Sequence, residues 1–263
     1  MQLNLDGYDH LKLTRTGTVL TVAFDRPERY NAFNPAMHHA LARLLVDLAY
    51  DEETRVVVLT GAGRAFSAGG DMSAERTTPE SFAREAIDGR NIVQGLLDCE
   101  KPIICRLNGD AIGLGATIAL LCDVVVAADT ARIADPHVKM GLVAGDGGVV
   151  IWPALVGPMR AKYYLLTGDM VAAPEAQSLG LITRAVPAEA LDATVAAVVD
   201  KLVAGAPLAI RFTKRSINAF MKAQAALQFD LSLGYEGVTI LSEDHEEAKA
   251  AFLAKRKPQF RGR

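Results

Sequence analysis

Runs of apolar residues, several of them followed by glycine-rich turns, constrain the fold of this chain more than any other feature. Largely apolar segments occupy Val56–Leu59, Pro102–Leu107 and Asp123–Ala127, and a helical pattern at Phe82–Leu97 separates the first two. Strands that are covered by helices on both faces read as such uninterrupted runs. The alternation of these strands with helices predicts an α/β fold with parallel strand pairing. The stretch Met72–Ser81 is polar and rich in turn residues, which predicts a mobile surface loop.

Two β-rich runs precede this alternation. They occupy His10–Arg15 and Thr18–Asp25, with the turn residues Thr16 and Gly17 between them. Pro35 then begins a helix. Its apolar residues recur with a period of 3.6 residues, at Met37, Leu41, Leu44, Leu45 and Leu48.

The chain is almost wholly helical in pattern from about Pro187 onward. The predicted helices are Leu191–Val203, Leu208–Leu227, Asp230–Leu241 and Asp244–Lys255. We therefore divide the chain into a core domain at residues 1–200 and a C-terminal helical domain at residues 201–263. The second domain is expected to pack elsewhere, on another subunit. Its apolar residues are too numerous to face water unassisted, and they include Leu227, Leu231, Leu233, Val238, Ile240 and Leu241.

Composition excludes several classes of function. Half of the residues are hydrophobic, 22% are charged, and the net charge is −3, so no basic excess exists to attract nucleic acid. The cysteines Cys99, Cys105 and Cys122 are odd in number and lack metal-ligand spacing, which favours a reducing cytoplasm and no bound metal. The N-terminal residues lack the pattern of a signal peptide, and no apolar stretch has the length of a membrane span. We expect a soluble cytoplasmic protein without nucleic-acid or membrane partners.

Two glycine-rich turns follow neighbouring strands and could carry chemistry. Arg64–Asp71 (RAFSAGGD) follows the first, and Asn108–Gly115 (NGDAIGLG) follows the second, just before a helical segment at Ala116–Leu121. Turns of this kind leave backbone N–H groups unpaired and reachable. One such turn by itself more often only connects a strand to a helix. Two of them, each donating one N–H group, make an oxyanion hole that needs no side chain.

Five motifs in order and spacing resemble the enoyl-CoA hydratase/isomerase (crotonase) superfamily. They are RPERYNAFN (Arg26–Asn34), GRAFSAGGDM (Gly63–Met72), KPIICRLNGDAIGLGATIALLCD (Lys101–Asp123), LLTGD (Leu165–Asp169) and AFLAKRKPQF (Ala251–Phe260). The resemblance runs from about residue 10 to the C-terminus. It implies a spiral of ββα units and a C-terminal helical domain used in trimers that commonly pair into hexamers. It also implies an acyl-CoA substrate and no separate cofactor, because CoA is part of the substrate.

The resemblance also implies site residues. The oxyanion-hole N–H groups map onto Ala68 and Leu114. Substrate and CoA contacts map onto Arg29, Ala32, Ala68, Gly69, Gly70, Asp71, Met72, Gly113, Leu114, Phe252 and Lys255. The cationic members suit the anionic CoA phosphates, although Arg29 and the run Lys255–Lys257, taken alone, would more often be part of a solvated surface.

The sequence departs from the family pattern at the two glutamates that family hydratases use to add water. Thr117 and His137 occupy those positions, and the threonine hydroxyl cannot serve as an acid or base near neutral pH. The imidazole of His137 can, because it titrates close to neutrality. Asp146 could orient the imidazole and raise its basicity. The plainer alternatives are a packed histidine and a Gly-Asp-Gly-Gly turn.

The pair His137 and Asp146 also resembles oxocamphor hydrolase and the β-diketone hydrolases, whereas the retained C-terminal motif resembles CoA-binding relatives. Three functions therefore remain open. The first, which we favour, is an acyl-CoA enzyme of hydratase/isomerase type with His137 as the acid/base. The second is a hydrolase of a carbon–carbon bond or thioester, with water activated by His137 and Asp146. The third is a catalytically silent CoA-binding subunit. If His137 is not the acid/base, Glu236 on the C-terminal helices is the next carboxylate to consider.

Overall fold

The structure is a computed structural model of the chain and describes residues 2–72 and 77–263. Most of the predicted loop Met72–Ser81 therefore lies outside the described residues or in the helix that follows. That helix, α2 (Pro79–Asp98), begins earlier than its apolar pattern predicts. Thr78 forms a capping box with Ser81, which satisfies free N–H groups of the first turn and extends the helix into polar sequence.

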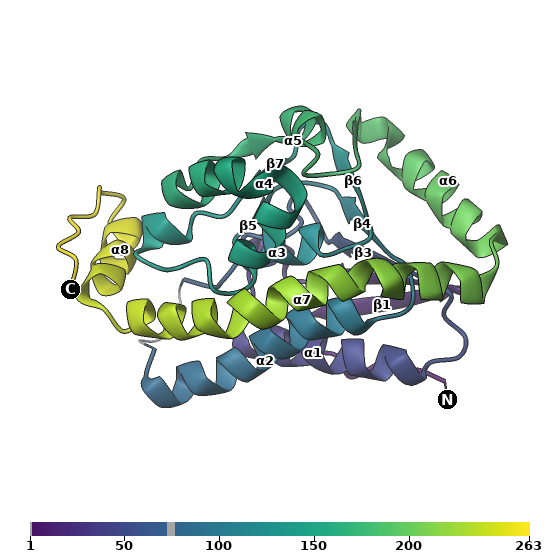
Figure 1. Cartoon of the computed structure of the whole chain (residues 1–263), viewed down its shortest axis with the longest axis horizontal. Coiled ribbons are helices and arrows are strands. Elements are labelled where there is room, and N and C mark those ends of the chain that lie inside the picture. The colour runs from purple at the N-terminus through teal and green to yellow at the C-terminus, as the bar shows by residue number, and fades with distance from the viewer. Residues whose placement is uncertain (1, 73–76) are drawn as a thin grey trace.

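A six-stranded sheet forms the centre of the molecule (Figure 1). It begins with the antiparallel hairpin of β1 (Leu11–Thr16) and β2 (Val19–Phe24). The next strands all pair in parallel, and they are β3 (Val56–Gly61), β4 (Ile103–Leu107), β6 (Val124–Ala128) and β9 (Arg184–Val186). The predicted α/β fold with parallel pairing is confirmed. A second, three-stranded sheet contains β5 (Ala111–Ile112), β7 (Arg132–Ala134) and β8 (Val171–Ala172).

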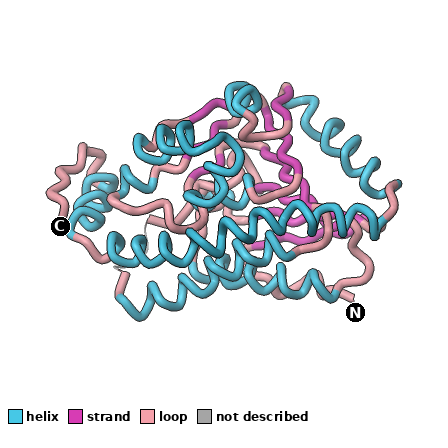
Figure 2. Tube along the Cα trace, viewed as in Figure 1, coloured by secondary structure: helices cyan, strands magenta, loops and turns pink. Residues whose placement is uncertain are grey.

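Helices cover both faces of the large sheet, so its central strands β3, β4 and β6 are largely apolar on both sides. Figure 2 shows the strands gathered between α6 (Leu191–Ala204) and the layer that contains α1 (Pro35–Tyr50), α2 and α7 (Pro207–Ile240). Leu191 and Val195 of α6 pack on Val56, Ile104 and Val126 of the sheet. The apolar face of α1 packs in the main core, and the side chain of Asn34 caps its first turn by accepting from the Met37 N–H.

Further turns and helices follow the strands along the chain. They are the 3-10 turns η1 (Pro27–Arg29), η2 (His137–Met140) and η3 (Ala188–Ala190) and the helices α3 (Leu114–Leu120), α4 (Gly148–Thr167) and α5 (Ala173–Leu179). All residues of α3 are buried. Because α3 and η2 follow β5 and β7, they bring backbone and side-chain groups from separate strand ends to one region of the molecule.

The C-terminal helices differ from the prediction in two ways. The predicted helices Leu208–Leu227 and Asp230–Leu241 are one continuous helix, α7, which α8 (Glu243–Leu253) follows. No glycine or proline separates the two predicted segments, and the intervening Phe229 is buried in the core.

α7 also packs across its own core, rather than on another subunit alone. Its Lys214 side chain pairs with Asp123 at 2.7 Å, and the Asn218 amide donates to the Leu97 carbonyl at 3.0 Å. The proposed division at residues 200 and 201 falls within α6, and the two-domain description remains a prediction.

Within the described residues, no helix by itself is both long and apolar enough to span a membrane. The segments Ala188–Ala204 and Pro207–Ile240 reach that length and composition only as a pair bent by 110°.

Candidate active site

The two glycine-rich turns meet at the carboxyl ends of the parallel strands, where α/β sheets commonly bind ligands. Ser67 and Ala111 form a parallel bridge, and the Ile112 N–H donates to the Ser67 carbonyl at 2.9 Å. The contact requires glycine at position 69. Its φ is +84°, and an added Cβ would lie 2.8 Å from the Ile112 carbonyl oxygen. Gly69, the first of the two adjacent glycines, is therefore a condition for the two turns to approach each other.

The predicted oxyanion donors need one correction. The Ala68 N–H is not free, because it donates to the Tyr30 carbonyl at 2.9 Å. Two residues later, the Gly70 N–H has no hydrogen-bond partner among the described residues, and neither has the N–H of Leu114 on the second turn. Gly70 and Leu114 both line the same cavity. The pair of available backbone donors is therefore Gly70 and Leu114 rather than Ala68 and Leu114.

His137 and Asp146, the predicted catalytic pair, lie in contact inside this cavity. The Nε2 atom of His137 is 3.3 Å from Oδ2 of Asp146. On the other side of the ring, Nδ1 contacts Oδ1 of Asp135, a fully buried carboxylate. The imidazole is thus held between two carboxylates. Asp135 was missed from the sequence, although its place two residues before His137 was a usable signal.

The two carboxylates change the protonation expected of His137. Burial by itself would lower the pKa of His137, but the charges of Asp146 and Asp135 raise it well above 6.5. Although burial acts to raise the pKa of Asp146, the charge of His137 and hydrogen bonds from His137 and Thr117 lower it below 3.8. Near neutral pH the pair is therefore an imidazolium and a carboxylate, so the ionised Asp146 can accept a proton and the charged His137 cannot.

Thr117, which replaces a family glutamate, also belongs to the site. Its side chain is fully buried at the second turn of α3, and its hydroxyl donates to Oδ1 of Asp146 at 3.2 Å. An ionised carboxylate is favoured by hydrogen bonds of this kind. Thr117 therefore cannot exchange protons itself but helps to keep Asp146 ionised.

A further carboxyl group reaches the cavity from α7. Glu236 is 8% exposed and lines the same space as His137 and Asp146. Burial, together with the charges of Asp146, Asp135 and Glu85, outweighs the opposing effect of His137 and raises the pKa of Glu236 to about 8. Glu236 is consequently protonated for the most part at neutral pH. Almost a hundred residues separate it from His137, so only the path of α7 across the core brings them together.

The cavity has a volume of about 560 Å³ and combines apolar walls with these few polar groups. Most of the predicted substrate-binding residues line it, namely Ala68, Gly69, Gly70, Asp71, Met72, Gly113, Leu114 and Phe252. Arg29, Ala32 and Lys255 do not. The first and last are exposed, and the buried Ala32 uses its carbonyl to accept from Arg26, which also pairs with Asp71 at 3.0 Å.

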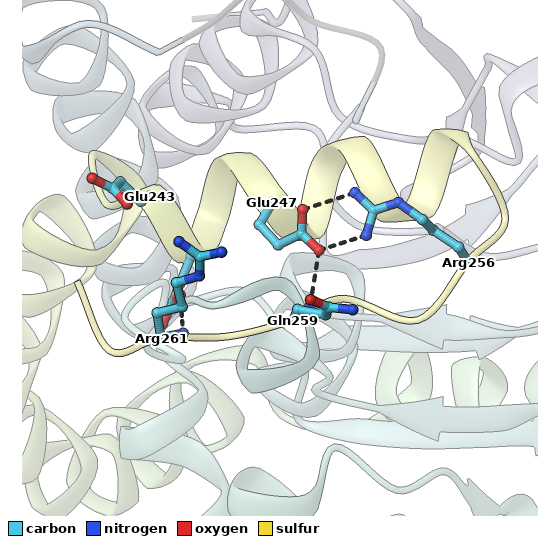
Figure 3. A pocket seen from close by; sticks show the side chains of 6 residues that line it. Glu243, Glu247, Arg256, Gln259 and Arg261 are labelled. Atoms are coloured by element: carbon cyan, nitrogen blue, oxygen red, sulfur yellow. Dashed lines mark hydrogen bonds and ion pairs between the residues drawn. The ribbon is translucent and has the colours of Figure 1, made fainter.

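The C-terminal tail folds back along α8 and forms a second, polar hollow (Figure 3). Arg256 forms a two-point ion pair with Glu247, and its hydrogen bonds are the main reason that the pKa of Glu247 falls to about 2. The Gln259 N–H donates to the same carboxylate at 2.8 Å. Of the predicted basic run, Arg256 is therefore engaged within the tail, whereas Lys255 stays exposed.

Asp135, His137 and Asp146 also form a group with the residue types of a metal site. One ligand-type atom from each lies within 4.8 Å of the others. A charged imidazole held between two carboxylates accounts for the same arrangement without a metal. The expectation that the site uses no metal remains a prediction.

Comparison with known proteins agrees with this geometry. A family model described as enoyl-CoA hydratase/isomerase matches residues 14–263. The chain is 35% identical to 1,2-epoxyphenylacetyl-CoA isomerase of Escherichia coli, over 93% of this chain and 95% of that protein. An enoyl-CoA hydratase/isomerase from Mycobacterium paratuberculosis has a similar solved structure, with a TM-score of 0.88 and 34% identity, over 92% of this chain and 97% of the other. A β-diketone hydrolase from the cyanobacterium Anabaena is also similar, with a TM-score of 0.81 and 27% identity, over 89% and 94%.

The chain is an enzyme of the enoyl-CoA hydratase/isomerase family. The predicted family and the crotonase-like fold class are thereby confirmed. The alternative of a catalytically silent subunit loses its support.

Proposed function

We propose that this enzyme moves a proton between carbon atoms of an acyl-CoA thioester and so isomerises an unsaturated acyl group. The observation that carries the proposal is the pair of cavity carboxyl groups with opposite protonation, Asp146 and Glu236. Two titratable groups whose surroundings separate their pKa values are suited to the roles of base and acid. Asp146 is then the base, and Glu236 is the acid.

Backbone N–H groups support the first step. When Asp146 removes a proton from the acyl chain, the electron pair of the broken C–H bond moves through the conjugated system to the thioester oxygen. The N–H groups of Gly70 and Leu114 are available to stabilise that negative charge. The charged His137 ring lies close to the second turn. A Cβ atom added to Gly113, the residue before Leu114, would lie only 3.4 Å from the Cε1 atom of His137. The ring therefore places a positive charge near these N–H groups. His137 serves as a fixed cation here, rather than as the proton-transferring group favoured from the sequence.

Protonated Glu236 supports the second step. Its proton can be delivered to a different carbon atom while the electron pair returns from the oxygen to form the shifted double bond. Transfer of the first proton from Asp146 to Glu236 then restores the starting state. No atoms are gained or lost, so substrate and product are isomers. CoA is part of the substrate, and the proposal includes no separate cofactor.

Hydration fits this site less well. Addition of water needs one group to activate water and another to protonate the α-carbon, and both family glutamates are replaced, by Thr117 and His137. Loss of one general acid or base costs roughly 10²- to 10⁴-fold in rate. We therefore expect slow hydration of crotonyl-CoA compared with a two-glutamate hydratase.

Incubation of the enzyme with a 3-enoyl-CoA in heavy water tests the proposal. We expect conjugated 2-enoyl-CoA to form and deuterium to appear in the acyl chain, without a gain of one water molecule in mass. Asp146→Asn should slow both changes by roughly 10²-fold or more. An active enzyme that yields only the hydrated product, or isomerisation at full rate in Asp146→Asn, would overturn the proposal.

A hydrolase is the second candidate, because the chain is similar to the β-diketone hydrolase and the contact between His137 and Asp146 could orient a water molecule. This reading needs a neutral His137, whereas the flanking carboxylates raise its pKa. The same incubation separates the two functions. A hydrolase would release either free CoA, detected by thiol titration, or a shortened acid, detected by mass spectrometry.

A further inference from the structure

His38 is a polar group in the cavity that the proposed proton transfer does not use. It lies in the first turns of α1, and its ring stacks on Phe33 with 5.3 Å between ring centroids and 29° between ring planes. The residue lines the same cavity as Asp146. Its Nδ1 atom is buried and has no hydrogen-bond partner within the part of the chain that the structure describes.

An unpartnered ring nitrogen at this position calls for an explanation. Buried polar atoms in native proteins nearly always find a partner, and leaving one without a partner destabilises the fold. Phenylalanine would preserve the stacking on Phe33 without that cost. Because Nδ1 has almost no accessible surface as the ring lies, a ligand in the cavity supplies the missing hydrogen bond once the His38 ring turns toward it.

The protonation of His38 defines what it can bind. Burial lowers the pKa of His38 to about 4, and the nearby carboxylates of Asp146 and Asp88 offset only part of that shift. At neutral pH the ring is therefore uncharged, with one nitrogen that donates and one that accepts. Such a ring suits a hydroxyl or carbonyl oxygen. A carboxylate would gain no charge pairing from it and would face the ionised Asp146.

The rest of the cavity wall is largely apolar. Phe82 comes from α2, and Leu233 and Ile240 come from α7. Pockets of this kind bind mainly through apolar contact, and a few polar groups determine the specificity. An acyl chain made only of hydrocarbon would leave His38 without a partner in the complex.

We propose that His38 is a specificity-determining residue that hydrogen-bonds a neutral oxygen atom in the acyl chain, so that the preferred substrates are oxygenated acyl-CoA thioesters. The proposal rests on the function proposed above and narrows its substrate class. Sites built to bond a substrate hydroxyl discriminate strongly against the analogue that lacks it, because their own polar groups are then left unpaired.

Binding calorimetry with unreactive, saturated thioesters tests this inference apart from catalysis. The probes are octanoyl-CoA and its isomers with one hydroxyl group at carbons 4 to 8. We expect at least one hydroxy isomer to bind about 10-fold more tightly than octanoyl-CoA, the effect of one net hydrogen bond. The His38→Phe variant should lose that preference, and its binding of octanoyl-CoA should be unchanged or tighter.

The neighbouring histidine offers a matched control. The side chain of His39 is 69% exposed and contacts Asp88 at 3.5 Å, so His39→Phe introduces the same residue outside the cavity. This control should keep the wild-type preference. If His38→Phe does not fold, His38→Leu replaces it with the same expected loss.

The outcomes separate this inference from the proposed function. Equal binding of all isomers by the wild-type enzyme, or a preference that survives in both apolar variants, overturns the role of His38 while acyl-CoA binding stands. Absence of binding of every thioester would overturn both proposals. A preference that disappears only in the His38 variants supports the inference.

Discussion

The Nε2 atom of His137 lies 3.3 Å from Oδ2 of Asp146, and both residues line the cavity. Because Asp135 contacts the opposite ring nitrogen, His137 is enclosed between two acids. The arrangement makes the imidazole a structural cation, and the second acid, Asp146, lines the cavity.

Substitution of His137 should destabilise the fold. His137→Gln leaves Asp135 and Asp146 buried without a cation, which typically costs on the order of 3–5 kcal/mol. The folded-state pKa of His137 is raised, so its contribution is complete below about pH 6.5 and is lost as the pH rises through the raised pKa. Urea unfolding at several pH values measures the difference.

The matched control for this prediction is the double variant His137→Gln with Asp135→Asn, which removes one acid together with the cation. It should recover part of the lost stability. A His137→Gln protein as stable as the wild type at pH 6 would contradict the ion-pair interpretation.

Removal of the Thr117 hydroxyl should change the pH dependence of activity. Thr117→Val eliminates the hydrogen bond to Asp146 and so raises the pKa of that carboxyl group. Since Asp146 must be ionised to act as a base, the acidic limb of the kcat/KM profile should move to higher pH. Thr117→Ser keeps the hydroxyl and should keep the profile. An identical profile in the valine variant would show that the hydrogen bond does not influence the base.

Glu236 should lower stability at alkaline pH. Its pKa of about 8 in the folded state lies above the ordinary 4.5, so its favourable contribution is present below pH 4.5 and is lost as the pH rises through 8. Glu236→Gln removes this dependence and should be more stable than the wild type by a few kcal/mol at pH 8, but not at pH 4.5. Thermal or urea unfolding at the two pH values measures this. A pH-independent difference would place the titration elsewhere.

Binding of CoA should weaken at high salt if exposed cations contact its phosphates. Arg29 and Lys255 are the predicted contacts, and both are exposed. Ala substitutions at these two positions should reduce both the affinity and its salt dependence in calorimetry, because screening removes interactions between exposed charges. Lys201→Ala is the control, because Lys201 lies on α6, on the opposite face of the sheet from α1. Salt-independent CoA binding would contradict the assignment of both residues.

The outer face of α7 should form a subunit interface. Large apolar side chains on this helix are more than half exposed, including Phe220, Leu227, Leu231 and Val238. Large exposed apolar patches mark surfaces that contact another protein. We expect a trimer or hexamer by light scattering at micromolar concentration, and Leu227→Glu should shift the population toward smaller species. A wild-type monomer under these conditions would refute the prediction.

The order of strands and helices could be read from the sequence because it depends on local pattern. The largely apolar runs at Val56–Leu59 and Pro102–Leu107 correspond to β3 and β4, since strands buried on both faces leave little place for polar residues. The points at which helices begin and end are less visible in the sequence. Both the early start of α2 at its capping box and the unbroken course of α7 past Phe229 depend on contacts beyond the repeating pattern.

Motif spacing identified the family, the glycine-rich turns and the pair His137 and Asp146, because these features follow from residues close together in sequence. The tertiary structure decided which groups are free and which are charged. The N–H of Ala68 is occupied by a hydrogen bond to the Tyr30 carbonyl, whereas the N–H of Gly70 has no partner among the described residues. Asp135 gives His137 its second acidic partner, and the path of α7 buries Glu236 beside them. The availability of a donor and the pKa of a carboxyl group both depend on neighbours within a few ångströms, and only the folded chain determines which neighbours those are.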